Sequence, residues 1–172
     1  AKTTLDDVAR EAGCARATVY RIFSGKQDLL QAMVQREADR FGAATVAAAA
    51  DAATLGDAAV AVVLTGARFA AEHEALRFVM AVEPGLLLPY ISFEAGDGML
   101  AEAATRLAPA FDRFVDAEHA LRLAEWIVRF GISYLCSPEA ADIYDADRVR
   151  ALVTDFILPG LARPVSDQGV TA

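Results

Sequence analysis

The side chains with the clearest chemistry gather in a short segment near the start of the chain, between residues 14 and 26. This segment carries three basic residues and no acidic residue, although the whole chain has a formal net charge of −8. A guanidinium can donate two hydrogen bonds to a guanine edge, a methyl group can contact thymine, and a phenol or ammonium can bind a phosphate. The hydroxyl of Thr4, which precedes this segment, is a further candidate. The candidate DNA-contacting residues are thus Thr4, Arg16, Ala17, Thr18, Tyr20, Arg21 and Lys26.

The overall acidity does not exclude nucleic acid, because the charge is distributed unevenly. Residues 1–40 carry a net charge of +1, whereas the remaining residues carry −9. The local field, not the total charge, decides whether a surface attracts phosphate. The alternative interpretation is that the basic segment is only the solvated face of an ordinary helix pair.

Two short helices are expected to position these side chains. Thr4 and Asp7 form a capping-box pattern at the start of the first, and Gly13 suits the left-handed residue that ends it. The second is expected from residue 15 or 16 to residue 23. Its inward-facing residues should be Val19, Ile22 and Phe23. Cys14, in the turn, is expected to be a small buried apolar residue, with a redox role as the alternative. The pattern predicts a helix-turn-helix.

This region resembles the TetR/AcrR family of bacterial transcriptional regulators over about residues 3–40. The residues that carry the resemblance are Ala12, Gly13, Thr18, Val19, Tyr20, Phe23, Lys26, Leu29 and Leu30. The resemblance implies a DNA-binding head on a helical body that binds a small effector and pairs through its last two long helices. Two features depart from the family pattern. A further amphipathic helix usually precedes the one at Thr4, and we expect it to be missing here. Ala15 stands where a serine cap is common.

The rest of the chain has the composition of an all-α body. Hydrophobic residues make up 55% of the chain, and they recur at helical spacing with almost no strand-like alternation. We expect a DNA-binding domain over residues 1–45 and an effector-binding and dimerisation domain over 46–172. A long helix should run from Lys26 to about residue 50, with Leu29, Leu30, Met33, Val34 and Phe41 on its apolar side. A central helix should start at the Thr54 and Asp57 capping pattern and run to about Glu72.

Two later helices, near residues 117–136 and 146–158, are the expected dimer interface. The first has one polar stripe and is apolar on the rest of its circumference, so it should bury two faces. Asp145 should cap the second, and Pro159-Gly160 should end it.

An effector pocket in the body is expected to be apolar with a few polar anchors. Its candidate lining residues are Arg68, Phe69, Glu72, His73, Phe78, Tyr90, Phe93, Met99, Phe111, Trp126 and Phe130. Each of them is also compatible with an ordinary core or surface position.

Other classes of function lack their signatures. No apolar run is long enough to cross a membrane, no secretory signal is seen, and two cysteines make no disulfide framework or zinc site, so a cytoplasmic location is expected. Asp116 and His119 form only half of a di-metal motif. No catalytic, phosphate-loop or dinucleotide pattern is present, so we expect no enzyme activity, no cofactor and no metal.

The sequence therefore predicts a regulator of transcription, most simply a repressor. It should bind a palindromic double-stranded operator as a homodimer and be released by a small, largely apolar effector. The alternative is a helical small-molecule-binding or protein-interaction module that does not read DNA.

Overall fold

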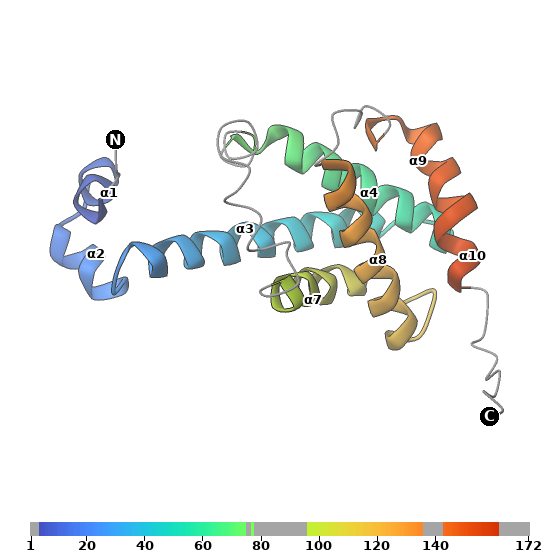
Figure 1. Ribbon diagram of the computed structural model, residues 1–172, viewed down its shortest axis with the longest axis horizontal. Helices are drawn as coiled ribbons and strands as arrows, with labels where there is room; N and C mark the ends of the chain where they lie inside the picture. Colours follow the sequence, from blue (N-terminus) through green and yellow to red (C-terminus); the bar gives the residue numbers. More distant parts are fainter. Residues whose placement is uncertain (1–3, 75–76, 78–95, 136–142, 162–172) are drawn as a thin grey trace, which may run out of the picture. The chain divides into compact units, whose positions relative to one another are not determined.

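The computed structural model describes residues 4–74, 77, 96–135 and 143–161, and all regular structure in these ranges is helical (Figure 1). The chain divides into two compact units, Ala1–Arg40 and Phe41–Ala172, which we call unit 1 and unit 2. The helices of unit 1 are α1 (Leu5–Glu11), α2 (Arg16–Ile22) and the first part of α3 (Lys26–Ala49). Unit 2 contains the rest of α3, then α4 (Leu55–Glu72), α7 (Gly96–Leu107), η2 (Ala108–Ala110), α8 (Ala117–Leu135), α9 (Ala146–Leu152), η4 (Val153–Ile157) and α10 (Leu158–Leu161). The predicted all-α fold class is confirmed.

Unit 1 begins with the predicted capping box. The Thr4 hydroxyl accepts a hydrogen bond from the Asp7 amide at 3.2 Å, and the Asp7 carboxylate accepts one from the Thr4 amide at 3.0 Å. The Asp7 carboxylate also accepts from the Thr4 hydroxyl and from Arg10. The bonds that it accepts, first those from the Thr4 hydroxyl and amide and then that from Arg10, lower the pKa of Asp7 to about 2. Gly13 has a φ of 64°, as expected for the left-handed residue that ends the first helix.

The core of unit 1 is small. Leu5, Ala9 and Val19 are buried, and Phe23 and Leu29 pack against them. Val19 and Phe23 are four residues apart and so share the inward side of α2. Ile22 lies off that side and is 59% exposed, so the expectation that it packs inward is wrong. Cys14 is also exposed, because the turn does not close over it as expected.

The apolar side predicted for α3 is only partly covered. Leu29 and Phe41 are half-buried, as expected for residues that pack on a core. Three other members of that set, Leu30, Met33 and Val34, lie about half exposed on the surface of unit 1. Their spacing of three and four places them on one face of the helix.

Unit 2 is built around α4, as its nearly uniform apolar sequence predicts. Thr54 caps this helix by accepting from the Asp57 amide at 3.1 Å. Seven of its side chains are buried: Ala58, Ala59, Val60, Val62, Val63, Ala67 and Ala70. The first five of these belong to one core that also contains Leu107, Phe111, Leu123, Ile127, Val149 and Val153, from the helices α7 to η4 and the turn after η2.

Two contacts fix the carboxyl-terminal part of α3 in unit 2. Gly42 lies so close to α7 that a β-carbon built there would be 2.9 Å from Cβ of Arg106. Beyond the end of the helix, the Arg113 guanidinium donates to the carbonyl oxygens of Ala49 and Ala52 and lies over the Phe114 ring. A cation at this position satisfies carbonyl groups that a helix end leaves unpaired.

The carboxyl-terminal helix differs from its predicted end. Asp145 caps α9 as expected, by accepting from the amides of Asp147 and Arg148. The helix does not end at Pro159-Gly160, because a π turn over η4 leads directly into α10, which contains both residues. Pro159 has no N–H to donate to the preceding turn, and the i→i+5 bonding of η4 stands directly before it.

Candidate nucleic-acid interface

The α2 helix presents one continuous polar face. Its candidate residues Arg16, Ala17, Tyr20 and Arg21 are all exposed, and Thr18 is half-buried. The spacing of four between Arg16 and Tyr20, and between Ala17 and Arg21, places these side chains on one side of the helix. Val19 is buried beneath them, so the face is held against the core of unit 1 from the opposite side. The structure therefore brings together every candidate residue of α2.

The amino end of α2 has no side-chain cap, as Ala15 led us to expect. Ala15 is extended, makes no side-chain capping bond, and accepts from the Thr18 amide through its carbonyl at 2.9 Å. An uncapped end leaves backbone N–H groups of the first turn without an intrahelical acceptor.

An ion pair that the sequence did not indicate orients Arg16. Its Nη1 lies 2.9 Å from Oδ2 of Asp6 on α1. The arginine side chain is still 72% exposed, so the pair contributes little to stability. It does place a carboxylate beside one of the three basic groups of the candidate surface. In the sequence Asp6 is an acid of the first turn of the Thr4 helix, next to the capping residue Asp7, and nothing local to it points to Arg16.

The two remaining candidates lie at helix starts. Lys26 is exposed at the first residue of α3. In the same turn, Asp28 accepts from the Ser24 amide at 2.9 Å and from its hydroxyl at 3.3 Å. Thr4 is exposed, but its hydroxyl already donates to Asp7 at 2.7 Å. Lys26 is thus available to a phosphate, whereas Thr4 is committed to its capping box.

The candidate effector residues are only partly brought together. The Phe69 ring lies 5.2 Å from that of Phe41 and 5.4 Å from that of His73. Arg68 and Glu72 lie on the same helix and are exposed. These residues form a local cluster around the carboxyl end of α4.

The other candidates differ from the expected pocket wall. Phe111 is fully buried in the core of unit 2, and Trp126 is 65% exposed on α8, because the buried side of that helix is occupied by Leu123 and Ile127. Phe130 is half-buried, with its ring 4.6 Å from that of Tyr134. Phe78, Tyr90 and Phe93 lie outside the described residues, as does the side chain of Met99.

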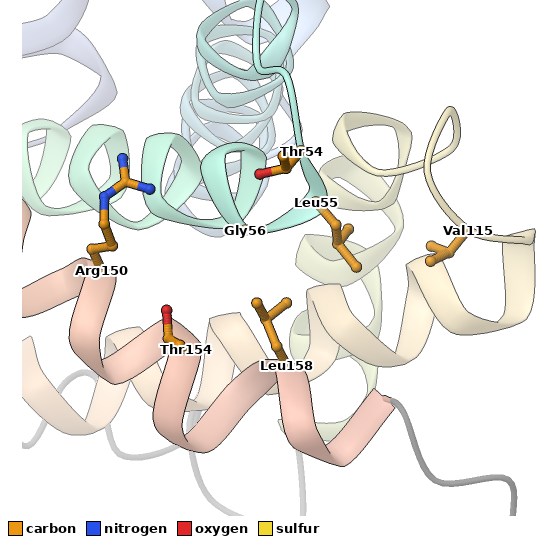
Figure 2. A pocket seen from close by; sticks show the side chains of 7 residues that line it. All are labelled: Thr54, Leu55, Gly56, Val115, Arg150, Thr154 and Leu158. Atoms are coloured by element: carbon orange, nitrogen blue, oxygen red, sulfur yellow. The ribbon is translucent and has the colours of Figure 1, made fainter.

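A groove that the sequence did not predict lies elsewhere in unit 2, between the start of α4 and the continuous helical segment Ala146–Leu161, which we call the α9–α10 segment (Figure 2). Its volume is about 540 Å³, and its lining residues are Thr54, Leu55, Gly56, Val115, Arg150, Thr154 and Leu158. In the sequence, the pattern that corresponds to this groove is the four-residue spacing of Arg150, Thr154 and Leu158, which places them on one side of a helix.

Metal and membrane signatures are missing from the parts of the chain that the structure describes. No cluster of three or more His, Cys, Asp or Glu residues there could hold a metal ion. Nor is any helix within those ranges long and apolar enough to cross a membrane. The Asp116 carboxylate instead accepts from the amide of His119 at 2.9 Å and contacts its Nδ1 at 2.8 Å, which lowers the pKa of Asp116.

Known proteins similar to this chain are regulators of transcription. Residues 1–33 match the family model described as bacterial regulatory proteins, tetR family. The HTH-type transcriptional regulator AlkX of Mycobacterium tuberculosis (strain ATCC 25618 / H37Rv) is 36% identical over 160 residues, which are 89% of this chain and 74% of that protein. A second protein of the same strain, described as an uncharacterized HTH-type transcriptional regulator, is 30% identical over 90% of this chain and 73% of its own length.

A solved structure is similar over most of the chain. It is the crystal structure of the TetR family repressor AlkX from Dietzia sp. strain DQ12-45-1b, described as implicated in biodegradation of n-alkanes. The match has a TM-score of 0.67 and 27% sequence identity, and it covers 92% of this chain and 84% of the other.

Proposed function

The chain belongs to the TetR family of bacterial transcriptional regulators, and from that premise we propose that it is a ligand-responsive repressor that binds a palindromic operator as a homodimer. The observation that carries the proposal is the exposed face of α2, which presents Arg16 and Arg21 over a buried Val19. The proposed place of action is the cytoplasm, where the bacterial chromosome lies.

On this proposal α2 is the recognition helix in the major groove. Arg16 and Arg21 donate to guanine edges, and the methyl groups of Ala17 and Thr18 contact thymine. Tyr20 and Lys26 bind phosphates and set the register, with Thr4 beside the backbone. Three cations from one chain are few for tight binding, so two heads are needed. In a two-fold dimer they enter successive major grooves roughly 34 Å apart.

The proposed dimer interface is formed by α8 and the α9–α10 segment. Support comes from large apolar side chains that a single chain leaves exposed. Trp126 on α8 is 65% exposed, Phe156 in η4 is 73% exposed, and Leu121 on α8 is also exposed. Burying such groups against a second copy stabilises a dimer by the hydrophobic effect.

The proposed effector is small and largely apolar, and it binds near the cluster of Phe69 and His73 at the end of α4. The aromatic contacts with Phe41 support this position. The n-alkane context stated for the Dietzia repressor supports an apolar ligand. To release the operator, the effector must favour the non-binding conformation by several kcal/mol.

Fluorescence anisotropy with promoter DNA from beside the protein's own gene tests the proposal. We expect saturable, sequence-dependent binding at two salt concentrations and a lower affinity at the higher one. Absence of binding at low salt by the full chain would favour the alternative, a helical small-molecule-binding or protein-interaction module that does not read DNA.

A further inference from the structure

The groove between α4 and the α9–α10 segment is separate from the proposed effector cluster at the other end of α4. It starts beside the cap of α4 at Thr54, whereas Phe69 and His73 mark the end of that helix. Its volume of about 540 Å³ is within the range of small-molecule pockets. Arg150, Thr154 and Leu158 form one wall from the carboxyl-terminal helix, and Leu55 and Val115 lie opposite (Figure 2).

One end of the groove is polar but has little net charge. Arg150 reaches from α9 toward α4 (Figure 2). Its Nη1 lies 2.6 Å from Oδ1 of Asp57. The Thr54 hydroxyl donates to the same carboxylate at 2.7 Å. Hydrogen bonds from Thr54 and then Arg150 lower the pKa of Asp57, so the pair is ionised at neutral pH. A guanidinium has five N–H donors, more than the Asp57 contact uses.

The other end of the groove is apolar. Leu55, Val115 and Leu158 converge there (Figure 2). Gly56 keeps this end open, because a β-carbon at that position would lie 3.3 Å from Cδ1 of Leu158. Eight residues separate Arg150 from Leu158, which corresponds to roughly 12 Å along a helix. A ligand that fills the groove must therefore be elongated, with one polar end.

The groove wall formed by the α9–α10 segment contains the π turn η4. Thr154 lies within η4, and Leu158 follows it directly. A π turn widens the helix by one residue and is often found at functional sites. Here it accompanies a hydroxyl, that of Thr154, placed between the polar and apolar ends of the groove (Figure 2).

We propose that this groove binds an uncharged amphiphile, an alkyl chain that ends in a hydroxyl or carbonyl group. The neutral head accepts a hydrogen bond from Arg150 and forms a second one with the Thr154 hydroxyl. The alkyl chain lies against Leu55, Val115 and Leu158. An anionic head is disfavoured because it faces Asp57, and a cationic head is disfavoured because it faces Arg150. A plain alkane makes no hydrogen bond to the N–H donors of Arg150 that the Asp57 contact leaves over.

A methyl-resolved NMR titration of the full chain with octan-1-ol tests the proposal. The methyl signals of Leu55, Val115 and Leu158 should shift saturably. Octanoate, octylamine and n-octane should each bind at these signals about fivefold to tenfold more weakly, the effect of one hydrogen bond. No saturable shift at the three residues, or tighter binding of any charged analogue, would overturn the proposal. DNA binding does not enter this measurement, so the outcome is independent of the repressor assignment.

Variants locate the head and the chain of the ligand. Thr154→Trp fills the groove from an exposed position, so it should abolish the octan-1-ol shifts at Leu55 and Val115 without a change in circular dichroism. Arg150→Met should weaken binding about fivefold to tenfold, whereas Arg148→Met, two residues away and outside the lining, should leave it unchanged. Asp57→Asn should retain octan-1-ol binding and strengthen octanoate binding. Wild-type affinity in Thr154→Trp, or equal effects of the two arginine variants, would refute the assignment.

Discussion

The guanidinium of Arg16 on α2 is held 2.9 Å from the carboxylate of Asp6 on α1. A basic residue of the proposed DNA-binding face is therefore partly neutralised before DNA arrives. Arg16 must share or break this pair to reach a base edge. Because Arg16 is 72% exposed and Asp6 is 35% exposed, the pair is weak and can be exchanged for a contact with DNA.

Removal of the Asp6 charge should strengthen DNA binding. Asp6→Asn frees Arg16 and removes one negative charge near the phosphates, so we expect a severalfold gain in affinity that shrinks as salt rises. Anisotropy titrations at two salt concentrations measure it. Glu11→Gln is the matched control, since Glu11 is an exposed acid at the far end of the same helix. An equal gain in both variants would show that the charge matters and the pairing does not.

Arginine and lysine variants should separate base reading from phosphate binding. Arg16→Ala and Arg21→Ala should each cost about 1–3 kcal/mol on the preferred operator and relax its sequence preference. Lys26→Ala should weaken binding to all DNA sequences alike. It should also reduce the slope of log K against log salt concentration by about 1. The measurement is anisotropy with operator and scrambled DNA over a salt series. Wild-type affinity in all three variants would place the DNA-binding surface elsewhere.

The capping box of α1 should make the stability of unit 1 depend on acid. The pKa of Asp7 is about 2 in the folded chain, below its ordinary value of 3.8. A depressed carboxyl pKa contributes stability that is complete above the ordinary value and is lost as pH falls through the folded value. The hydrogen-exchange protection factors of Leu5–Glu11, taken relative to the unfolded chain at each pH, should accordingly fall between about pH 4 and pH 2. Asp7→Asn should remove this dependence, and an unchanged pH profile in that variant would contradict the assignment.

Two helical glycines should respond oppositely to alanine. At Gly42 a β-carbon would meet Arg106 at 2.9 Å, so Gly42→Ala should destabilise unit 2 by about 1–3 kcal/mol, less the gain in helix propensity. At Gly131 on α8 nothing lies within 4 Å, so Gly131→Ala should stabilise by up to about 1 kcal/mol. Urea unfolding followed by circular dichroism gives both values. Stabilisation of both variants would mean that α3 and α7 can move apart without cost.

Sequence alone predicted the features of this fold that depend on near neighbours. The caps at Thr4, Thr54 and Asp145 each need only a hydroxyl or carboxylate and an amide two or three residues away. The exposure of individual side chains was harder to predict, because it depends on which other elements pack against each face of a helix. Ile22 carries an apolar side chain at a position that the core of unit 1 does not reach.

The candidate site shows the same contrast between features set by neighbouring residues and features set by contacts across space. The face of α2 could be derived from helical spacing, because one helix carries all its members. The Asp6–Arg16 pair joins two helices, and the groove at Arg150 joins α4 to a segment almost a hundred residues later. Neither could be read from a local pattern. The predicted helix stop at Pro159 is wrong because a π turn leads into it, and no local pattern indicates that turn.

The exposed indole of α8 gives the sharpest test of dimerisation. Trp126 is 65% exposed in the single chain, so Trp126→Glu should leave the protomer folded while placing a charge in the proposed interface. Loss of a large aromatic anchor typically costs 2 kcal/mol or more, about a thirtyfold weaker dimer. Sedimentation equilibrium measures the dimer constant, and circular dichroism checks the fold. Tyr144→Glu is a control at another exposed aromatic residue, outside α8 and the α9–α10 segment. If Trp126→Glu remains as dimeric as wild type, α8 is not the interface. If it becomes monomeric and also loses cooperative operator binding, pairing through α8 is what brings two heads to one operator.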